Sequence, residues 1–289
     1  MLYNYLWYLN MGENNPLQKY FRQPSIYVTL PSGGKHYPPG TLDMPANGEI
    51  PIYPMTAIDE ITARTPDALF NGSAVMQIFK SCVPNIKDPW VIPQTDVDLL
   101  LTAIKIASYG HEMEMTVTCP HCSETQDYAL DLRTVIDQYT APDYAKSASI
   151  GDMEIYFRPM SYNELNTASQ AQFEQQKAMA MTTENAEMPE GEKMALLSEA
   201  LSKVTRLSMD AIANSIALIR VAGENVENSD HIKEFINNAD SKIFNRIRDH
   251  LAELRANAEM KPLRIKCSNE ECSKEYEQPF TLDMSNFFA

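Results

Sequence analysis

The sequence lacks a long apolar run, a run of basic residues and a glycine-rich phosphate loop, and each absence excludes a class of protein. No stretch approaches the roughly 18 consecutive apolar residues of a membrane-spanning helix. The 24 basic side chains are outnumbered by 39 acidic ones, which gives a net charge of −15. Nucleic acids and anionic membranes are bound through Lys and Arg, so neither is an expected partner.

Sequence signatures of common enzyme classes are also missing. The chain contains no Gly-x-Ser-x-Gly elbow, no His-Glu-x-x-His helix and no phosphate-binding loop. The histidines outside the cysteine motifs are scattered, without the Ser or Cys and Asp companions of a catalytic triad. No catalytic constellation is therefore predicted.

The overall composition is that of a folded chain. With 44% hydrophobic and 22% charged residues it resembles globular rather than disordered proteins. Its 289 residues are enough to bury a large core in one or two domains. The first ten residues are aromatic and apolar without a basic residue, which is not the pattern of a secretion signal. They are either an arm that docks on a partner or the product of a start codon assigned too early, with Met11 as the true start.

The spacing of apolar residues in the first part of the chain predicts short strands followed by helices. Residues 12–55 are rich in turn signals, whereas the residues after them show helical spacing. The helix predicted over 96–109 is apolar on nearly all sides, as expected of a core helix, and ends before Gly110, a natural helix terminator. The elements predicted here are strands at 26–30 and 50–53 and three helices capped by Thr56 (with Asp59 at the third position), Ser73 and Thr95.

The second part of the chain predicts two hairpins separated by helices. On both sides of the cysteine motifs at 119–122 and 267–272, apolar and polar residues alternate, as they do in strands. Between them, a capping box at 161–164 begins a polar helix. The acidic segment 181–192 is predicted to be an exposed loop. The further helices are predicted at about 192–207, 209–222 and 229–258, the last with a break near Asp240.

The four paired cysteines are the one motif with specific chemistry. Cys119 and Cys122 are separated by two residues, Cys267 and Cys272 by four, and each pair interrupts a predicted hairpin. Such knuckles present two thiolates each, and four thiolates complete the closed tetrahedral set of a structural zinc site. A reducing compartment favours metal over disulfide for this spacing. We predict one structural zinc ion, held by all four of these cysteines.

Other interpretations of the cysteines stay open. Cys-Pro-His-Cys is also the active-site tetrapeptide of thiol-disulfide oxidoreductases, although the residues after Cys122 alternate rather than forming the expected helix. The thiols can also be unconnected structural residues. His121 lies within the first knuckle and can replace one sulfur as ligand, but with four cysteines available it is expected to be exposed. Cys82, on an apolar helix face, is predicted to be a small buried hydrophobic residue.

The charge around the cysteines argues against nucleic-acid binding, which many zinc ribbons perform. Residues 111–133 carry five acids and one base, and residues 267–279 carry four acids and one base. A phosphate-binding surface would be basic. The ribbon is therefore expected to brace the fold or to contact protein.

Several segments occur in a recognisable order. They lie at 15–24 (NPLQKYFRQP), 26–34, 52–60 (IYPMTAIDE), 71–72, 96–101, 108–110 and 119–122. This order resembles the baseplate proteins of T-even-type contractile-tailed phages, with the greatest likeness to baseplate hub subunits and hub assembly proteins. The resemblance covers about 15–130 well and the later helices loosely. The apolar first ten residues are not expected in a typical member.

The resemblance implies a non-enzymatic structural component of a phage tail baseplate, in its hub region. Such a protein is made in the host cytoplasm, joins the virion tail, and contacts hub, wedge or tube proteins rather than nucleic acid, membrane or a small-molecule substrate. The alternative within the family is a hub assembly chaperone that is not retained in the virion. The residues predicted to contact partners are Leu6, Trp7, Tyr8, Tyr20, Phe21, Lys35, His36 and Tyr37.

Taken together, the sequence predicts an α+β fold with an extended N-terminal region and a helical core, and with a zinc-ribbon module built from two distant knuckles. Residues 1–22 form an N-terminal arm, and 23–112 the β-turn region and helical core. The zinc-ribbon module combines 113–133 with 263–289. Residues 134–262 are a mainly helical insertion.

Overall fold

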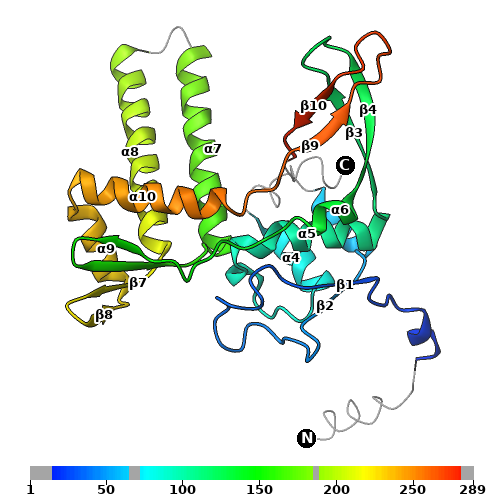
Figure 1. Cartoon of the computed structure of the whole chain (residues 1–289), viewed down its shortest axis with the longest axis horizontal. Coiled ribbons are helices and arrows are strands. Elements are labelled where there is room, and N and C mark those ends of the chain that lie inside the picture. The colour runs from blue at the N-terminus through cyan, green and yellow to red at the C-terminus, as the bar shows by residue number, and fades with distance from the viewer. Residues whose placement is uncertain (1–14, 65–71, 185–188, 281–289) are drawn as a thin grey trace, which may run out of the picture.

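The computed structural model describes residues 15–64, 72–184 and 189–280 of the chain. These residues form eight α-helices and small antiparallel sheets, which confirms the predicted mixed α+β class. Two projections rise from a broad base: one is a pair of long helices, and the other is a pair of β-hairpins (Figure 1). None of the described helices is long and apolar enough to cross a membrane.

The base is built around helix α5, as its apolar sequence predicts. Leu100 and Ile104 of α5 are fully buried and belong to the same cluster as Ile50, Ile52 and Phe79. The short strands β1 and β2 pair in antiparallel fashion, with Val28 opposite Ile50. The elements of this region are η1 (Pro16–Tyr20), β1 (Ile26–Val28), β2 (Ile50–Ile52), α2 (Ala57–Ala63), α4 (Ser73–Cys82), η2 (Pro89–Val91), α5 (Gln94–Tyr109) and α6 (Leu132–Ile136).

Local sequence signals set some of these helix ends, but the predicted caps Ser73 and Thr95 are wrong, because α4 and α5 begin directly after Gly72 and Pro93. Thr56 and Asp59 form a reciprocal capping box at the start of α2: the Asp59 N–H donates to the Thr56 hydroxyl, and the Thr56 N–H donates to the Asp59 carboxylate at 2.8 Å. Helix α5 ends at Tyr109, and Gly110 follows with a φ of 93°. Glycine adopts this positive φ without the steric cost that a side chain imposes.

One buried carboxylate fixes the loop between β1 and β2. Asp96 of α5 is fully buried and accepts hydrogen bonds from the Ser32 N–H at 2.9 Å, the Ser32 hydroxyl at 2.5 Å and the Tyr37 hydroxyl at 3.0 Å. Burial raises the pKa of Asp96 from its ordinary value, although these hydrogen bonds oppose the shift. The loop is thus held at both Ser32 and Tyr37.

A second apolar cluster lies under a four-stranded sheet. The strand order is β5-β6-β7-β8, all antiparallel, and α9 and α10 contribute Ile232, Ile236, Ile247 and Leu251 to the cluster. Asp240 caps α10, which confirms the predicted break. The elements are β5 (Ala148–Ile150), β6 (Met153–Phe157), β7 (Ile216–Val221), β8 (Glu224–Val226), α9 (Ser229–Asn238) and α10 (Ser241–Ala256).

The predicted helix at 209–222 is wrong, because its second half is strand β7. Ile216 pairs with Phe157 of β6, and β7 turns into β8 through Ala222 and Gly223, which have φ values of 51° and 84°. Two consecutive residues with positive φ are typical of a tight hairpin turn. Ile216 and Ile219 have helical spacing, but both are buried in β7 because the register of its pairing with β6 shifts between Tyr156 and Phe157.

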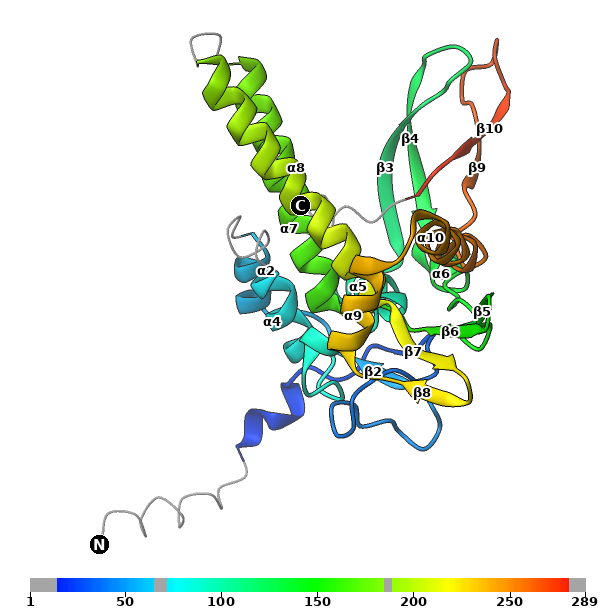
Figure 2. The same cartoon turned by 90° about the vertical axis from the view of Figure 1, so that its left-hand side faces the viewer.

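The helical projection consists of α7 (Tyr162–Glu184) and α8 (Glu190–Asn214), which lie side by side in both views (Figures 1 and 2). The predicted loop at 181–192 is therefore wrong at both of its ends, since 181–184 continue α7 and 190–192 begin α8. The predicted capping box is confirmed at the start of α7: the Ser161 N–H donates to the Glu164 carboxylate at 2.7 Å.

We predict that Asp96→Ala lowers the free energy of unfolding by about 3 kcal/mol, because it leaves the buried donors of Ser32 and Tyr37 without an acceptor. Chemical denaturation monitored by fluorescence measures the difference. Asp137→Ala, at an exposed aspartate, is the control and should leave stability unchanged. Equal stability of the two variants would contradict the clamping role of Asp96.

Candidate metal centre

The second projection consists of two β-hairpins from distant parts of the chain. The first pairs β3 (Glu112–Thr118) with β4 (Thr125–Asp131), and the second pairs β9 (Leu263–Lys266) with β10 (Glu275–Gln278). They are separate two-stranded sheets. Both views show them side by side, with their turns at the end far from the base (Figures 1 and 2).

The two cysteine-bearing turns have the same hydrogen-bond design. In the first, the Cys119 N–H donates to the Glu124 carbonyl at 2.8 Å, and in the second, the Cys267 N–H donates to the Lys274 carbonyl at 2.9 Å. Each turn closes through a serine with positive φ, 60° at Ser123 and 46° at Ser273. Each hairpin therefore presents two thiols from a tight turn, as the predicted knuckles require.

The thiol cluster, formed by Cys119, Cys122, Cys267 and Cys272, brings all four sulfurs within 4.8 Å of one another. Two contacts join the hairpins: Sγ of Cys122 lies 3.6 Å from Sγ of Cys267, and Sγ of Cys119 lies 4.0 Å from Sγ of Cys272. A disulfide needs about 2.05 Å. Four sulfurs at about 2.3 Å from a tetrahedral zinc ion lie about 3.8 Å apart, which matches the observed contacts.

An apolar cluster supports the thiols from below. Val117, Leu130 and Ile265 are buried between the hairpins, and Tyr276 packs with them. Cys119 and Cys267 belong to the same cluster, whereas Cys122 is exposed and Cys272 is half-buried. The thiol cluster thus has a buried side and a side open to solvent.

Burial, backbone N–H groups and neighbouring thiols shift the pKa values of the clustered thiols in different directions. Burial opposes ionisation of Cys119, but hydrogen bonds from the N–H groups of His121 and Cys122 and from neighbouring thiols bring its pKa to about 7. Burial raises the pKa of Cys267 to about 12, and the neighbouring thiols add to the shift. Gathering several thiolates here is unfavourable without a cation, and a bound divalent metal removes that penalty.

A glutamine that nothing in the sequence singled out also joins the hairpins. Nε2 of Gln126 on β4 donates to the Lys266 carbonyl at 3.0 Å, and Oε1 accepts from the Ser268 N–H at 2.5 Å. Gln126 lies 140 and 142 positions before these two residues in the sequence, so no motif spacing connects it with them. A link of this kind becomes visible only in three dimensions.

The other predicted site residues divide by their surroundings. Tyr20 and Phe21 are 73% and 56% exposed, Lys35 and His36 are exposed, and His121 is exposed as expected. Tyr37 is half-buried, and its hydroxyl donates a hydrogen bond to the Asp96 carboxylate. The predicted contact residues Leu6, Trp7 and Tyr8 lie outside the described residues. In the part of the chain that the structure describes, no second group of His, Cys, Asp and Glu side chains has the spacing of a metal site.

Comparison with known proteins identifies the family. The model of the family described as T4 bacteriophage base plate protein matches residues 23–289. The chain belongs to this family. Neither curated proteins nor solved structures gave a match. A T4-type baseplate protein is a structural component of the virion tail and acts through contacts with other tail proteins.

We predict that the thiols of the native, metal-free baseplate protein react with iodoacetamide in a fixed order, with Cys122 modified well before Cys82. Cys82 is fully buried and burial raises its pKa to about 12, whereas Cys122 is exposed. Peptide mass spectrometry over time measures the order. The denatured protein is the control and should show no such protection. Equal rates in the native protein would contradict the described packing.

Proposed function

We propose that this protein is a structural component of the baseplate hub region and that one zinc ion, bound by Cys119, Cys122, Cys267 and Cys272, fastens its two hairpins together. The observation that carries the proposal is the set of sulfur–sulfur contacts across the hairpins, 3.6 and 4.0 Å. Four thiolates form a closed coordination set, so the ion has no open position for water or substrate. Its role is therefore architectural.

The connectivity explains what such an ion contributes. Cys122 and Cys267 are 145 residues apart, and the hairpins that carry them share no strand pairing. A metal bond between them closes a long loop, which removes conformational entropy from the unfolded chain. Binding energy in small zinc modules is about 10–16 kcal/mol and is realised as folding free energy.

The cysteine geometry favours this role over thiol-disulfide exchange. Cys119 and Cys122 lie in a β-hairpin turn, whereas the oxidoreductase motif places its first cysteine at a helix N-terminus. Each of them also has a sulfur of the other hairpin within 4.0 Å. The arrangement thus uses all four cysteines, and the exchange reaction would leave Cys267 and Cys272 without a role.

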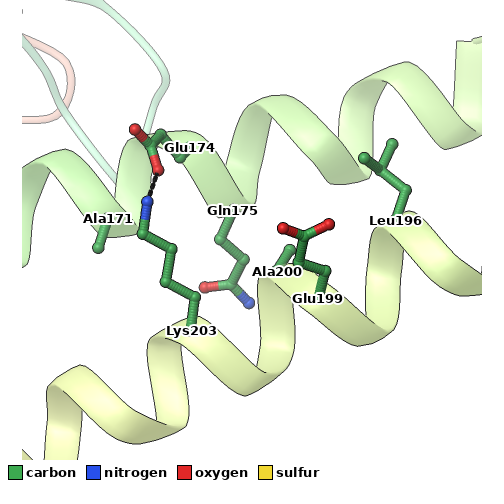
Figure 3. Close-up of a pocket in the computed structure, with 7 residues that line it drawn as sticks. All are labelled: Ala171, Glu174, Gln175, Leu196, Glu199, Ala200 and Lys203. Carbon is green, nitrogen blue, oxygen red and sulfur yellow. Dashed lines mark hydrogen bonds and ion pairs between the residues drawn. The ribbon is translucent and has the colours of Figure 1, made fainter.

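The helical projection is the proposed contact surface for other tail proteins. Helices α7 and α8 pair through mixed side chains, including an ion pair between Lys203 and Glu174 (Figure 3). No residue at 191–212 of α8 is buried, and Met194 and Leu201 are 69% and 53% exposed. Exposed apolar side chains that line one groove are typical of protein–protein contact sites. The groove is lined by Met194, Leu197, Ser198, Leu201, Ser202, Thr205, Arg206, Met209 and Asn237.

The predicted division of the chain is retained as part of the proposal. Three separate apolar clusters support it: one in the base, one under the four-stranded sheet and one between the hairpins. On this division, 1–22 is the arm, 23–112 the core, 113–133 with 263–289 the ribbon, and 134–262 the insertion that carries the helical projection.

We predict that Cys119→Ser and Cys267→Ser each reduce bound zinc from one equivalent to near zero. Loss of the folding free energy that the ion supplies should lower the melting temperature by roughly 10 °C or more. Elemental analysis and calorimetry of the purified proteins measure both effects. Cys82→Ala, which removes the one cysteine outside the cluster, is the control and should keep its zinc. Full zinc content in either serine variant would contradict the four-cysteine site.

A second prediction concerns the tail. We expect mass spectrometry of purified virions to detect this protein, and complementation with Leu201→Glu to reduce its amount in particles at least several-fold, because the charge must be desolvated at the contact. Ala195→Glu, at an exposed position outside the groove, is the matched control. Absence of the wild-type protein from virions would instead identify an assembly chaperone, and unchanged incorporation of Leu201→Glu would exclude the groove as the contact.

A further inference from the structure

The chain on both sides of Cys267 is held by a single side chain. Gln126 of the first hairpin donates to the carbonyl of Lys266, which precedes this cysteine, and accepts from the N–H of Ser268, which follows it. The distances are 3.0 and 2.5 Å. The position of Cys267 relative to the first hairpin is therefore fixed by two bonds that do not involve sulfur.

These two bonds matter because little else of a polar kind links the hairpins. The first hairpin pairs only β3 with β4, and the second only β9 with β10. Across the described residues, the hydrogen bonds between the hairpins are those of Gln126, apart from the sulfur contacts. The remaining contact between the hairpins is the packing of the apolar cluster. Apolar packing is non-directional, so it does not fix the register of one hairpin against the other.

The chemistry of the side chain suits this task. A primary amide offers a donor and an acceptor together, as a backbone peptide group does. Gln126 can therefore satisfy a carbonyl and an N–H two residues apart, in the manner of a neighbouring strand. Glutamate at this position keeps the acceptor but loses the donor, so the Lys266 carbonyl loses its partner.

We propose that Gln126 is a positioning residue of the metal centre, which holds Cys267 in register with Cys122 before the ion binds. This inference rests on the proposed zinc site. Partners that orient metal ligands without binding the ion commonly contribute a factor of 10–100 to metal affinity. Gln126 acts in the same way, but through the backbone of the ligand rather than its side chain.

The test compares the zinc affinities of the full-length wild type, Gln126→Ala and Gln126→Glu by competition with a chromogenic chelator. We expect both variants to bind zinc about 10–100-fold more weakly than the wild type. Cobalt(II) spectra should retain the thiolate charge-transfer band in both, because the ligands are unchanged. The melting temperatures of the metal-free proteins should fall by only a few degrees, because two exposed hydrogen bonds contribute about 1 kcal/mol to stability. A larger fall would indicate a general loss of stability rather than a loss of positioning.

Gln278→Ala is the matched control. Gln278 lies on β10, and its amide donates to the neighbouring Pro279 carbonyl rather than across the hairpins. We expect it to bind zinc like the wild type. Wild-type affinity in Gln126→Ala would overturn the positioning role and leave the zinc site intact. Failure of the wild type itself to bind zinc would overturn both.

Discussion

The structure depends on one constraint: two hairpins that share no strand pairing must meet at four sulfurs. Each hairpin is only a two-stranded sheet, and such a unit is marginally stable in water by itself. The apolar cluster beneath the thiols gives the pair a common core, and Gln126 sets its register. In the proposed centre, the metal joins the two cysteine-bearing turns, which lie beyond the apolar cluster.

This constraint determines how the rest of the chain is organised. The second hairpin follows α10, so joining it to the first hairpin brings the two ends of the segment between the hairpins to one place. The helical projection rises from the same base as the two hairpins (Figure 1). For a protein that acts by contact, a fixed relation between its surfaces reduces the entropy lost when partners assemble.

Local signals in the sequence predicted those features that depend on nearby residues. The cysteine pairs, the Thr56 capping box, the end of α5 at Gly110 and the break at Asp240 all rest on interactions within a few positions. Strand β7 was missed because its isoleucines also fit helical spacing, and only pairing with β6, about 60 residues earlier, distinguishes the two.

Two further features could not be predicted from the sequence: the ends of α7 and α8, and the role of Gln126. The segment 181–192 is acidic and contains Pro189, which suggests a loop, but the helix-forming residues on both sides extend α7 and α8 into it. Gln126 is an ordinary polar residue on a strand, and its function depends on Lys266 and Ser268. Four cysteines in two pairs could be predicted to meet, whereas the residue that aligns them could not.

The most direct measurement is X-ray absorption at the zinc edge on the purified, full-length protein. The proposed centre predicts one zinc ion surrounded by four sulfur atoms at about 2.3 Å and by no nitrogen or oxygen. A first shell that contains nitrogen or oxygen, or a protein purified under reducing conditions without bound metal, would contradict the claim that four thiolates from two distant hairpins close around one structural ion.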